Sequence, residues 1–174
     1  MSTVTILIPV LNEEQALPAT IACLAAMQPP PDEILLVDGG SSDNSMALAR
    51  AAGFRVERSK KRGRGAQINY GVRVATGEIV CVLHADTVLP VDAIAVIRQT
   101  MADTKTALAS FTPRIAGPTG TRWGSTFHNW IKTWYAPLLA RPHLFLRGVR
   151  LLFGDHAMFF RRDQIGRASC RERV

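Results

Sequence analysis

The chain has 174 residues, of which 47% are apolar and 20% are charged. This composition predicts one globular domain with a full hydrophobic core, and it excludes a disordered tail or a small disulfide scaffold. Lys and Arg number 21 against 14 Asp and Glu, which gives a net charge of +7. Much of the excess lies between Arg55 and Arg64, where a solvated surface, a phosphate site and a nucleic-acid site are the competing interpretations.

Three cysteines, Cys23, Cys81 and Cys170, are odd in number and widely spaced. They predict a reducing compartment without structural disulfides or a Cys-ligated metal. The N-terminus has no basic segment before its apolar run, and that run is shorter than the roughly 20 residues of a spanning helix. We therefore expect a cytoplasmic protein with no secretion signal and no transmembrane helix.

Apolar runs and helical periodicities alternate along the chain. The first run, Val4 to Val10, is apolar at nearly every position, as in a strand buried on both faces. Asn12 is the expected cap of a first helix, with Gln15 in the capping-box position. Strands are predicted at 4–10, 33–37, 54–58, 78–83 and 107–112, and helices at about 13–27, from the 38–43 turn to 53, at about 65–75 and from after Pro90 to about 101.

This alternation predicts an α/β fold with a mostly parallel sheet, right-handed crossovers and helices on both faces. Ligands of such sheets bind beyond the carboxyl ends of the strands, where the strand order reverses. An acidic rim at that edge would repel a pyrophosphate unless a divalent cation intervened, and oxygen ligands suit Mg²⁺ or Mn²⁺. The polar residues that follow the strands are Asn12, Glu13, Glu14, Asp38, His84 and Asp86.

The common nucleotide-binding loops are missing after the first strand. A Rossmann dinucleotide site requires G-x-G-x-x-G there, but the turn reads PVLNEE, and no GxxxxGK[ST] P-loop occurs. Asp38 would accept hydrogen bonds from a ribose or a base N–H, so the first two loops predict a nucleoside pocket. The basic residues at 58–64 would neutralise the remaining phosphate charge. Nucleic-acid binding is not expected, because these residues adjoin an acidic pocket rather than an aromatic groove.

Four motifs, PVLNEE, LLVDGGSSDNS, RGRGAQINYG and LHADT, occur in this order. They resemble glycosyltransferase family 2, whose GT-A fold enzymes move a sugar from a nucleotide-diphosphate sugar. The resemblance covers about residues 4–112 and resumes at Gly154–His156 and Phe159–Arg162. HADT and GDH also resemble a bacterial subgroup with HADT and GDQ. This implies a Rossmann-like GT-A sheet, a nucleotide-sugar-binding half at about 1–112 and a partial acceptor region at about 113–164.

The resemblance also assigns roles to individual residues. Asp86 would hold the Mn²⁺ or Mg²⁺ that bridges the diphosphate. The family's D-x-D motif reads His84-Ala85-Asp86 here, so His84 would ligate the metal, orient a neighbour or only pack. Asp155 would lie near the acceptor as a candidate base or as a turn residue, and the family's further acidic pair is missing after it. The remaining implied positions are Pro9, Asn12, Glu13 and Asp38 around the nucleoside, and Arg64 and Asn69 near the phosphates or the sugar.

The last ten residues, Ile165 to Val174, read IGRASCRERV. This segment resembles the translation of a widely used sequencing adapter, and a natural basic tail is the alternative. On the adapter interpretation residues 1–164 form the glycosyltransferase domain, 165–174 are a non-native tail, and the natural chain is C-terminally truncated after about Gln164. The absence of the acidic pair then has a simple explanation, and the fragment should bind donor but transfer sugar poorly.

The resulting hypothesis is an inverting, metal-dependent glycosyltransferase with an unknown acceptor. A nucleotidyltransferase is one alternative, although it would typically open with a Gly-rich loop carrying Lys or Arg. A non-catalytic nucleotide-sugar-binding protein is another. The stretch from Trp123 to Leu152, rich in Trp, Phe, Leu and Arg, predicts amphipathic helices for core packing or subunit contact, or for peripheral contact with a membrane and a lipid or isoprenoid acceptor.

Overall fold

The computed structural model describes residues 1–112, 116–117, 120–121, 123–124, 126–128, 131 and 157–164. The chain divides into two compact units, Met1–Ala109 with Met158–Val174, and Ser110–Ala157. Within the described ranges, none of the helices has the length and apolar character that a membrane span requires. The division into a nucleotide-sugar-binding half and an acceptor region is a functional one and stays a prediction.

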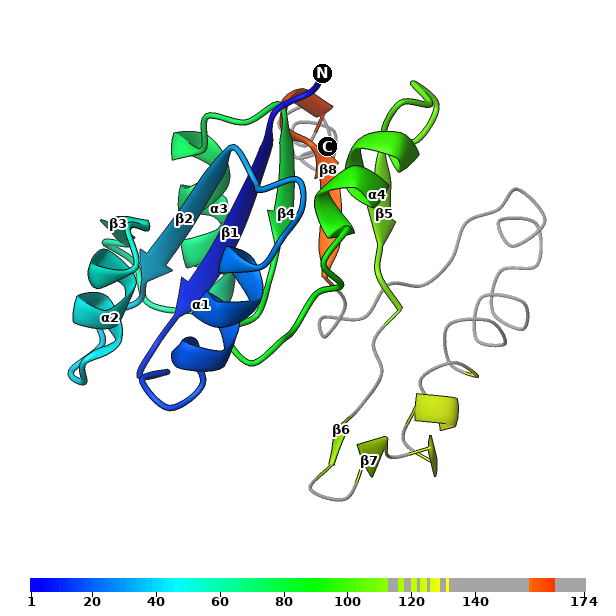
Figure 1. The fold of residues 1–174 in the computed structure, drawn as a ribbon. Helices are drawn as coiled ribbons and strands as arrows, with labels where there is room; N and C mark the ends of the chain where they lie inside the picture. The colour runs from blue at the N-terminus through cyan, green and yellow to red at the C-terminus, as the bar shows by residue number, and fades with distance from the viewer. Residues whose placement is uncertain are drawn as a thin grey trace. The chain divides into compact units, whose positions relative to one another are not determined.

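Strands and helices alternate through the first unit (Figure 1), as the sequence predicts. The second unit contains a short pair of antiparallel strands, β6 (Ala116–Gly117) and β7 (Gly120–Thr121). The other elements are β1 (Val4–Val10), α1 (Leu17–Ala25), β2 (Glu33–Asp38), α2 (Ser45–Ala51), β3 (Arg55–Arg58), α3 (Arg64–Val74), β4 (Ile79–Val82), α4 (Ala93–Thr100), β5 (Leu108–Ser110) and β8 (Met158–Arg161).

The main sheet has six strands in the order β3-β2-β1-β4-β8-β5. β1 pairs in parallel with both β2 and β4, and β2 pairs in parallel with β3. The chain runs outward from β1 through β2 to β3 and then returns to the other side of β1 as β4, so the strand order reverses between β1 and β4. β8, which was not predicted, pairs antiparallel with β4. The prediction of a mostly parallel α/β sheet is confirmed.

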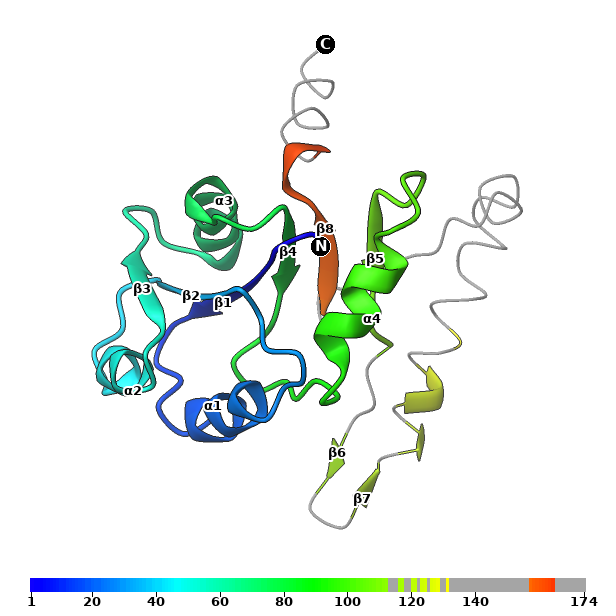
Figure 2. The ribbon, with the colours of Figure 1, turned by 45° about the horizontal axis from the view of Figure 1, so that its top comes forward.

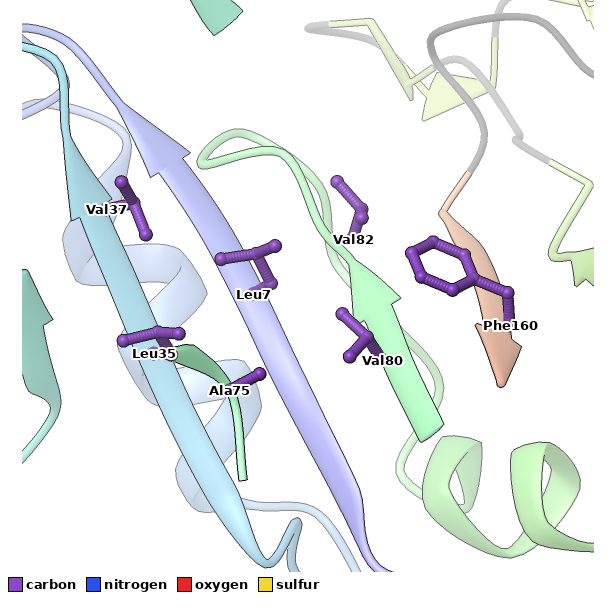
Figure 3. Packing of buried hydrophobic residues seen from close by; sticks show 7 residues of the cluster. All are labelled: Leu7, Leu35, Val37, Ala75, Val80, Val82 and Phe160. Atoms are coloured by element: carbon purple, nitrogen blue, oxygen red, sulfur yellow. The ribbon is translucent and has the colours of Figure 1, made fainter. Parts of the chain in front are cut away.

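Helices cover both faces of this sheet. Figure 2 shows α3 on one side and α1, α2 and α4 on the other. Under α3, Leu7, Leu35, Val80 and Phe160 belong to one buried cluster (Figure 3). Each fully buried Leu or Ile contributes about 1.5–3 kcal/mol. Close packing of α3 depends on Gly71, because a Cβ there would lie 2.3 Å from Leu7 Cδ1.

The start of α1 differs from the prediction. The helix begins at Leu17, with Ala16 as its N-cap and a proline in its first turn, rather than immediately after Asn12. Asn12 adopts a left-handed backbone conformation with φ 56°. Its side-chain carbonyl accepts the N–H of Ser42 at 2.8 Å. The predicted helix cap at Asn12 is therefore wrong, because a loop distant in sequence uses the oxygen that would have capped the helix.

β8 also holds the ends of two helices. Arg162 Nη1 donates to the carbonyl of Ala75, the C-cap of α3, at 2.6 Å. Arg161 Nη2 donates to the carbonyl of Met101, the C-cap of α4. Arg161 is the last residue of β8 and Arg162 follows it, and the two side chains reach helices on opposite faces of the sheet (Figure 2). A cationic group at a helix C-terminus also interacts favourably with the helix dipole.

Candidate functional site

The edge where β1 and β4 separate is shaped by Pro9. The Leu83 N–H donates to the carbonyl of Leu7 at 2.9 Å, and Pro9 follows two residues later in β1. A residue two positions along a strand directs its N–H to the same neighbour, and proline has none. The β1–β4 ladder therefore cannot continue past this point. Pro9 is buried and in register with Val37, so it shapes the edge of the predicted site from within the sheet.

Two loops at this edge are joined by hydrogen bonds, and we call them the paired loops (residues 11–16 and 39–44). Three consecutive N–H groups of the first loop donate to side chains of the second or of the start of α2. Asn12 N–H donates to Ser41 Oγ at 3.0 Å, and Glu13 N–H donates to Ser45 Oγ at 2.9 Å. Glu14 N–H donates to Asp43 Oδ2 at 3.1 Å.

The second loop returns these contacts. Its Ser42 N–H donates to Asn12 Oδ1, and its Asn44 N–H donates to Glu14 Oε2 at 3.0 Å. Hydrogen bonds from Ser45 and from the Glu14 N–H hold the pKa of Asp43 below its ordinary value, so this carboxylate stays charged at neutral pH. The NEE and SSDNS segments thus fix one another, a role that a motif-by-motif interpretation of the sequence does not predict.

Asp38 is the last residue of β2, and its side chain is only 2% exposed. Oδ1 accepts the N–H of Ser41 at 2.8 Å, while Oδ2 lies 3.6 Å from Nε of Arg58. The Arg58 side chain is 72% exposed, so solvent reaches this guanidinium. One carboxylate oxygen therefore supports the second loop, and the other has a loosely held partner that a ligand group would be able to replace.

Gln67 of α3 is a site residue that sequence reasoning missed. Its side chain is buried, and Nε2 donates to the carbonyls of Val10 and Val37 at 2.8 Å each. These carbonyls lie at the C-terminal ends of β1 and β2. A polar residue on the inner face of a helix breaks the apolar pattern there, and this interruption is the signal that would have found it.

Arg64 and His84 meet at the same edge. Arg64 begins α3 after Gly63, whose φ of 105° favours glycine. Its guanidinium contacts Nδ1 of His84, and because a guanidinium only donates, that ring nitrogen acts as the acceptor. His84 is 8% exposed. The structure therefore occupies one of the two nitrogens through which His84 would ligate a metal.

Asp86 lies two residues beyond His84 and is exposed. Thr87 Oγ1 donates to its Oδ1 at 3.4 Å, and the Thr87 N–H closes a turn on the His84 carbonyl. Among the residues that the structure describes, no three His, Cys, Asp or Glu side chains gather as a metal site. One exposed carboxylate still fits Mg²⁺ or Mn²⁺ in sites where substrate phosphates supply further ligands.

The remaining predicted residues are not gathered with this group. Asn69 is exposed on α3, roughly 200° around the helix from buried Gln67. Asp155 lies outside the described residues, as does most of the stretch from Trp123 to Leu152. Within that stretch Trp123 and Phe127 are described, and both are exposed.

Two solved structures that resemble this chain are glycosyltransferases. A mannosyltransferase from Pyrobaculum calidifontis, in complex with GDP-Man and Mn²⁺, aligns with a TM-score of 0.69 and 22% identity over 96% of this chain and 46% of its own. Glucosyl-3-phosphoglycerate synthase from Mycobacterium tuberculosis, in complex with Mn²⁺, UDP and phosphoglyceric acid, aligns with a TM-score of 0.65 and 22% identity over 93% of this chain and 56% of its own. The fold is that of the GT-A glycosyltransferases, as predicted.

Residues 5–166 match Glycosyl transferase family 2, and the chain belongs to that family. An uncharacterized glycosyltransferase of Mycobacterium tuberculosis (strain H37Rv) is 37% identical over 83 residues, which cover 48% of this chain and 36% of the relative. Undecaprenyl-phosphate 4-deoxy-4-formamido-L-arabinose transferase of Serratia proteamaculans is 38% identical over 95 residues, 48% of this chain and 28% of the enzyme. The aligned part of the chain thus spans about a third of these relatives.

Proposed function

We propose that this chain carries the nucleotide-sugar-binding part of an inverting, metal-dependent glycosyltransferase. The observation that carries the proposal is the position of Asp38. This buried carboxylate ends β2, and one of its oxygens lies beside the exposed guanidinium of Arg58. Membership of family 2 and the position of Asp38 beside the reversal of strand order support this assignment. The donor is a nucleotide-diphosphate sugar, the class of ligand named for the mannosyltransferase relative.

The paired loops form the nucleoside part of the site. Asp38 accepts a hydrogen bond from a base or ribose through Oδ2, while its Oδ1 keeps the Ser41 N–H and so the loop geometry. Asn12 and Glu13 lie beside the nucleoside, and their backbone N–H groups already donate to serine hydroxyls. Because these contacts exist before binding, the loops lose little additional conformational entropy when the nucleoside binds.

Arg64, His84 and Asp86 form the diphosphate part, with Asn69 as a more distant contributor. Asp86 holds the Mn²⁺ or Mg²⁺, and His84 orients the Arg64 guanidinium toward the phosphates through Nδ1 or adds a metal ligand through its other nitrogen. When bound, the cation stabilises negative charge on the departing nucleotide diphosphate. Arg64 supplies a fixed positive charge for the same group, which suits the planar geometry of guanidinium–phosphate contacts.

The acceptor is a lipid or isoprenoid at the inner face of a cytoplasmic membrane, and the protein associates with that surface peripherally. The arabinose transferase relative is named for undecaprenyl phosphate, which supports this choice. The exposed Trp123 and Phe127 side chains suit an interface of this kind. Asp155 is the candidate base that accepts the proton of the attacking hydroxyl.

Calorimetric titration of UDP and GDP, with Mn²⁺ and with chelator, tests the donor site. We expect one nucleotide to bind in a metal-dependent way, and Asp86→Asn to abolish that dependence while the fold survives. Asp92→Asn is the matched control, since Asp92 is another exposed carboxylate at the N-terminus of α4. Nucleotide binding that chelator leaves unchanged would disprove the metal assignment. Failure of both nucleotides to bind would disprove the donor site itself.

A further inference from the structure

We propose that Gln67 is a positioning residue of the donor site, which sets the spacing of the paired loops without touching the nucleotide. The inference rests on the proposed function. The contacts that support it do not depend on that function, because they join Gln67 of α3 to two strands of the sheet. Gln67 bonds to the ends of β1 and β2. Asp38 is the last residue of β2, and Asn12 follows β1 in the first of the paired loops.

The two hydrogen bonds of Gln67 act at the last residues of the strands. Val10 ends β1, and its carbonyl accepts both Gln67 Nε2 and the Gly39 N–H, the latter at 2.9 Å. Val37 precedes Asp38 at the end of β2 and accepts the second Nε2 hydrogen. One amide group thus bridges the ends of two neighbouring strands. Removing the amide would take one donor from each of the two carbonyls, so this bridge adds to the contacts that hold the strand ends together.

Gly39, the residue after Asp38, lies against the Gln67 amide and leaves little space around it. A Cβ on Gly39 would lie 3.0 Å from both Cδ and Nε2 of Gln67. The φ angle of Gly39 is not positive, in contrast to Gly40 at φ 106°, so a shortage of space and not backbone conformation requires the first glycine. A larger residue at position 39 would require the Gln67 amide to shift by a few tenths of an ångström, which would weaken its two hydrogen bonds. Gly39 and Gln67 are therefore coupled, and the second loop begins at the point of coupling.

The central experiment removes the amide and keeps the volume, with Gln67→Met. We expect the Kd of the bound nucleotide, UDP or GDP, to rise about tenfold, the size of one lost hydrogen bond. The matched control is Thr5→Val at the opposite end of β1. Thr5 is equally buried, donates to Glu33 and accepts from the Gly77 N–H, so its loss should lower Tm while the Kd changes less than about twofold.

A double-mutant cycle tests the coupling to Gly39. Gly39→Ala alone should raise the nucleotide Kd in the same direction as Gln67→Met but by less, because it displaces the amide bridge instead of removing it. In the Gln67→Met background the same alanine should add less than about twofold, since no bridge is left to displace. Equal Kd changes for Gln67→Met and Thr5→Val at matched loss of Tm would overturn the proposal. The proposal would also be overturned if the Kd changes of Gln67→Met and Gly39→Ala multiplied fully in the double variant.

A failure of the proposed function would be distinguishable from a failure of this inference. If the wild type binds neither nucleotide, the donor site is wrong, and amide hydrogen exchange then tests Gln67 alone. Gln67→Met should speed exchange of the Gly39 N–H at least about tenfold, because this group donates to the same Val10 carbonyl. The exchange of the Thr5 N–H serves as the internal reference. Unchanged Gly39 exchange would show that Gln67 does not hold the strand ends.

Discussion

β2 carries a carboxylate at each end, Glu33 with a side chain 10% exposed and Asp38 with one 2% exposed, and the two are held in different ways. At its first residue, Glu33 has both oxygens engaged: Oε2 accepts Thr5 Oγ1 at 2.6 Å and the Thr76 N–H at 2.8 Å, and Oε1 accepts Arg55 Nη1 at 2.9 Å. At its last residue, Asp38 has one engaged oxygen and one loosely partnered oxygen. The fully satisfied carboxylate stabilises the fold, and the partly satisfied one remains available to a ligand.

The contacts around Glu33 extend across the N-terminal ends of β1, β2 and β3. Arg55 also donates to the Val74 carbonyl at 3.0 Å and to Glu57, and Tyr70 donates to the other oxygen of Glu57. Burial alone would raise the pKa of Glu33, but the hydrogen bonds from Thr5, Thr76 and Arg55 outweigh it and hold that pKa below its ordinary value. This edge ties β1, β2 and β3 to the end of α3, which leaves the opposite edge free for binding.

The largest expected effect is on stability, from Glu33→Ala. Removing this carboxylate leaves three donors without their partner, and we expect the free energy of unfolding to fall by about 3 kcal/mol. Urea unfolding followed by circular dichroism measures the loss. Glu57→Gln is the control, because it changes a more exposed partner of the same Arg55 and should cost less than about 1 kcal/mol. Nearly equal losses in the two variants would remove the distinction between the buried and the exposed partner.

At the other end of β2, Asp38→Asn should act on binding more than on stability. Asn retains an oxygen for the Ser41 N–H but removes the charge, so we expect nucleotide affinity to fall by about 2 kcal/mol, more than tenfold. Calorimetric titration compares this variant with Glu33→Ala at a temperature where both are folded. Should Glu33→Ala weaken binding as much as Asp38→Asn, the proposed separation of the two ends of β2 would be wrong.

The third prediction concerns pH. Because the pKa of Glu33 is lowered on folding from 4.5, its contribution to stability is complete above that value. The contribution is lost as the pH falls through the lower pKa of the folded state. The difference in unfolding free energy between wild type and Glu33→Ala should therefore be constant at neutral pH and shrink below pH 4.5. Urea midpoints measured across this range provide the test, and a difference that stays constant into strong acid would contradict it.

The smallest effect is expected at Arg58, the partner of Asp38. Its side chain is mostly exposed and its Nε lies 3.6 Å from the carboxylate, so Arg58→Gln should change stability by less than about 0.5 kcal/mol. Thermal unfolding at low and high salt measures the change. A loss comparable to that of Glu33→Ala would mean that Asp38 is held as firmly as Glu33, and the comparison between the ends of β2 would fail.

The strands followed from the sequence because their apolar runs are local signals. Val4–Val10 is predicted residue for residue, and most other strand and helix ends differ by a few residues. β8 was missed because MFFR is too short to show a period, and its place between β4 and β5 depends on pairing with a distant strand. The late start of α1 has a similar cause, since the side chain of Asn12 is used by a loop thirty residues away.

The site was predictable where chain order alone fixes position. Asp38 and Asp86 follow strands, and parallel strands bring their carboxyl ends to one edge, so both could be placed before any contact was known. The contacts themselves were not predictable. Ser41 and Ser45 read as ordinary turn and cap residues, yet they bind the N–H groups of another loop. The polar Gln67 interrupts the apolar inner face of α3, but the sequence does not reveal its partners, which are carbonyls of two strands.

The order β4-β8-β5 has a consequence for the growing polypeptide. During synthesis β4 and β5 leave the ribosome well before Met158–Arg161, yet in the part of the chain that the structure describes β5 joins the sheet through β8. Until β8 arrives, β4 presents an unpaired apolar edge, and α3 and α4 lack the arginines that later hold their ends. The nascent chain is therefore exposed to mispairing until β8 emerges, and β8 with Arg162 then joins β5 to the sheet and holds the ends of α3 and α4 in one step.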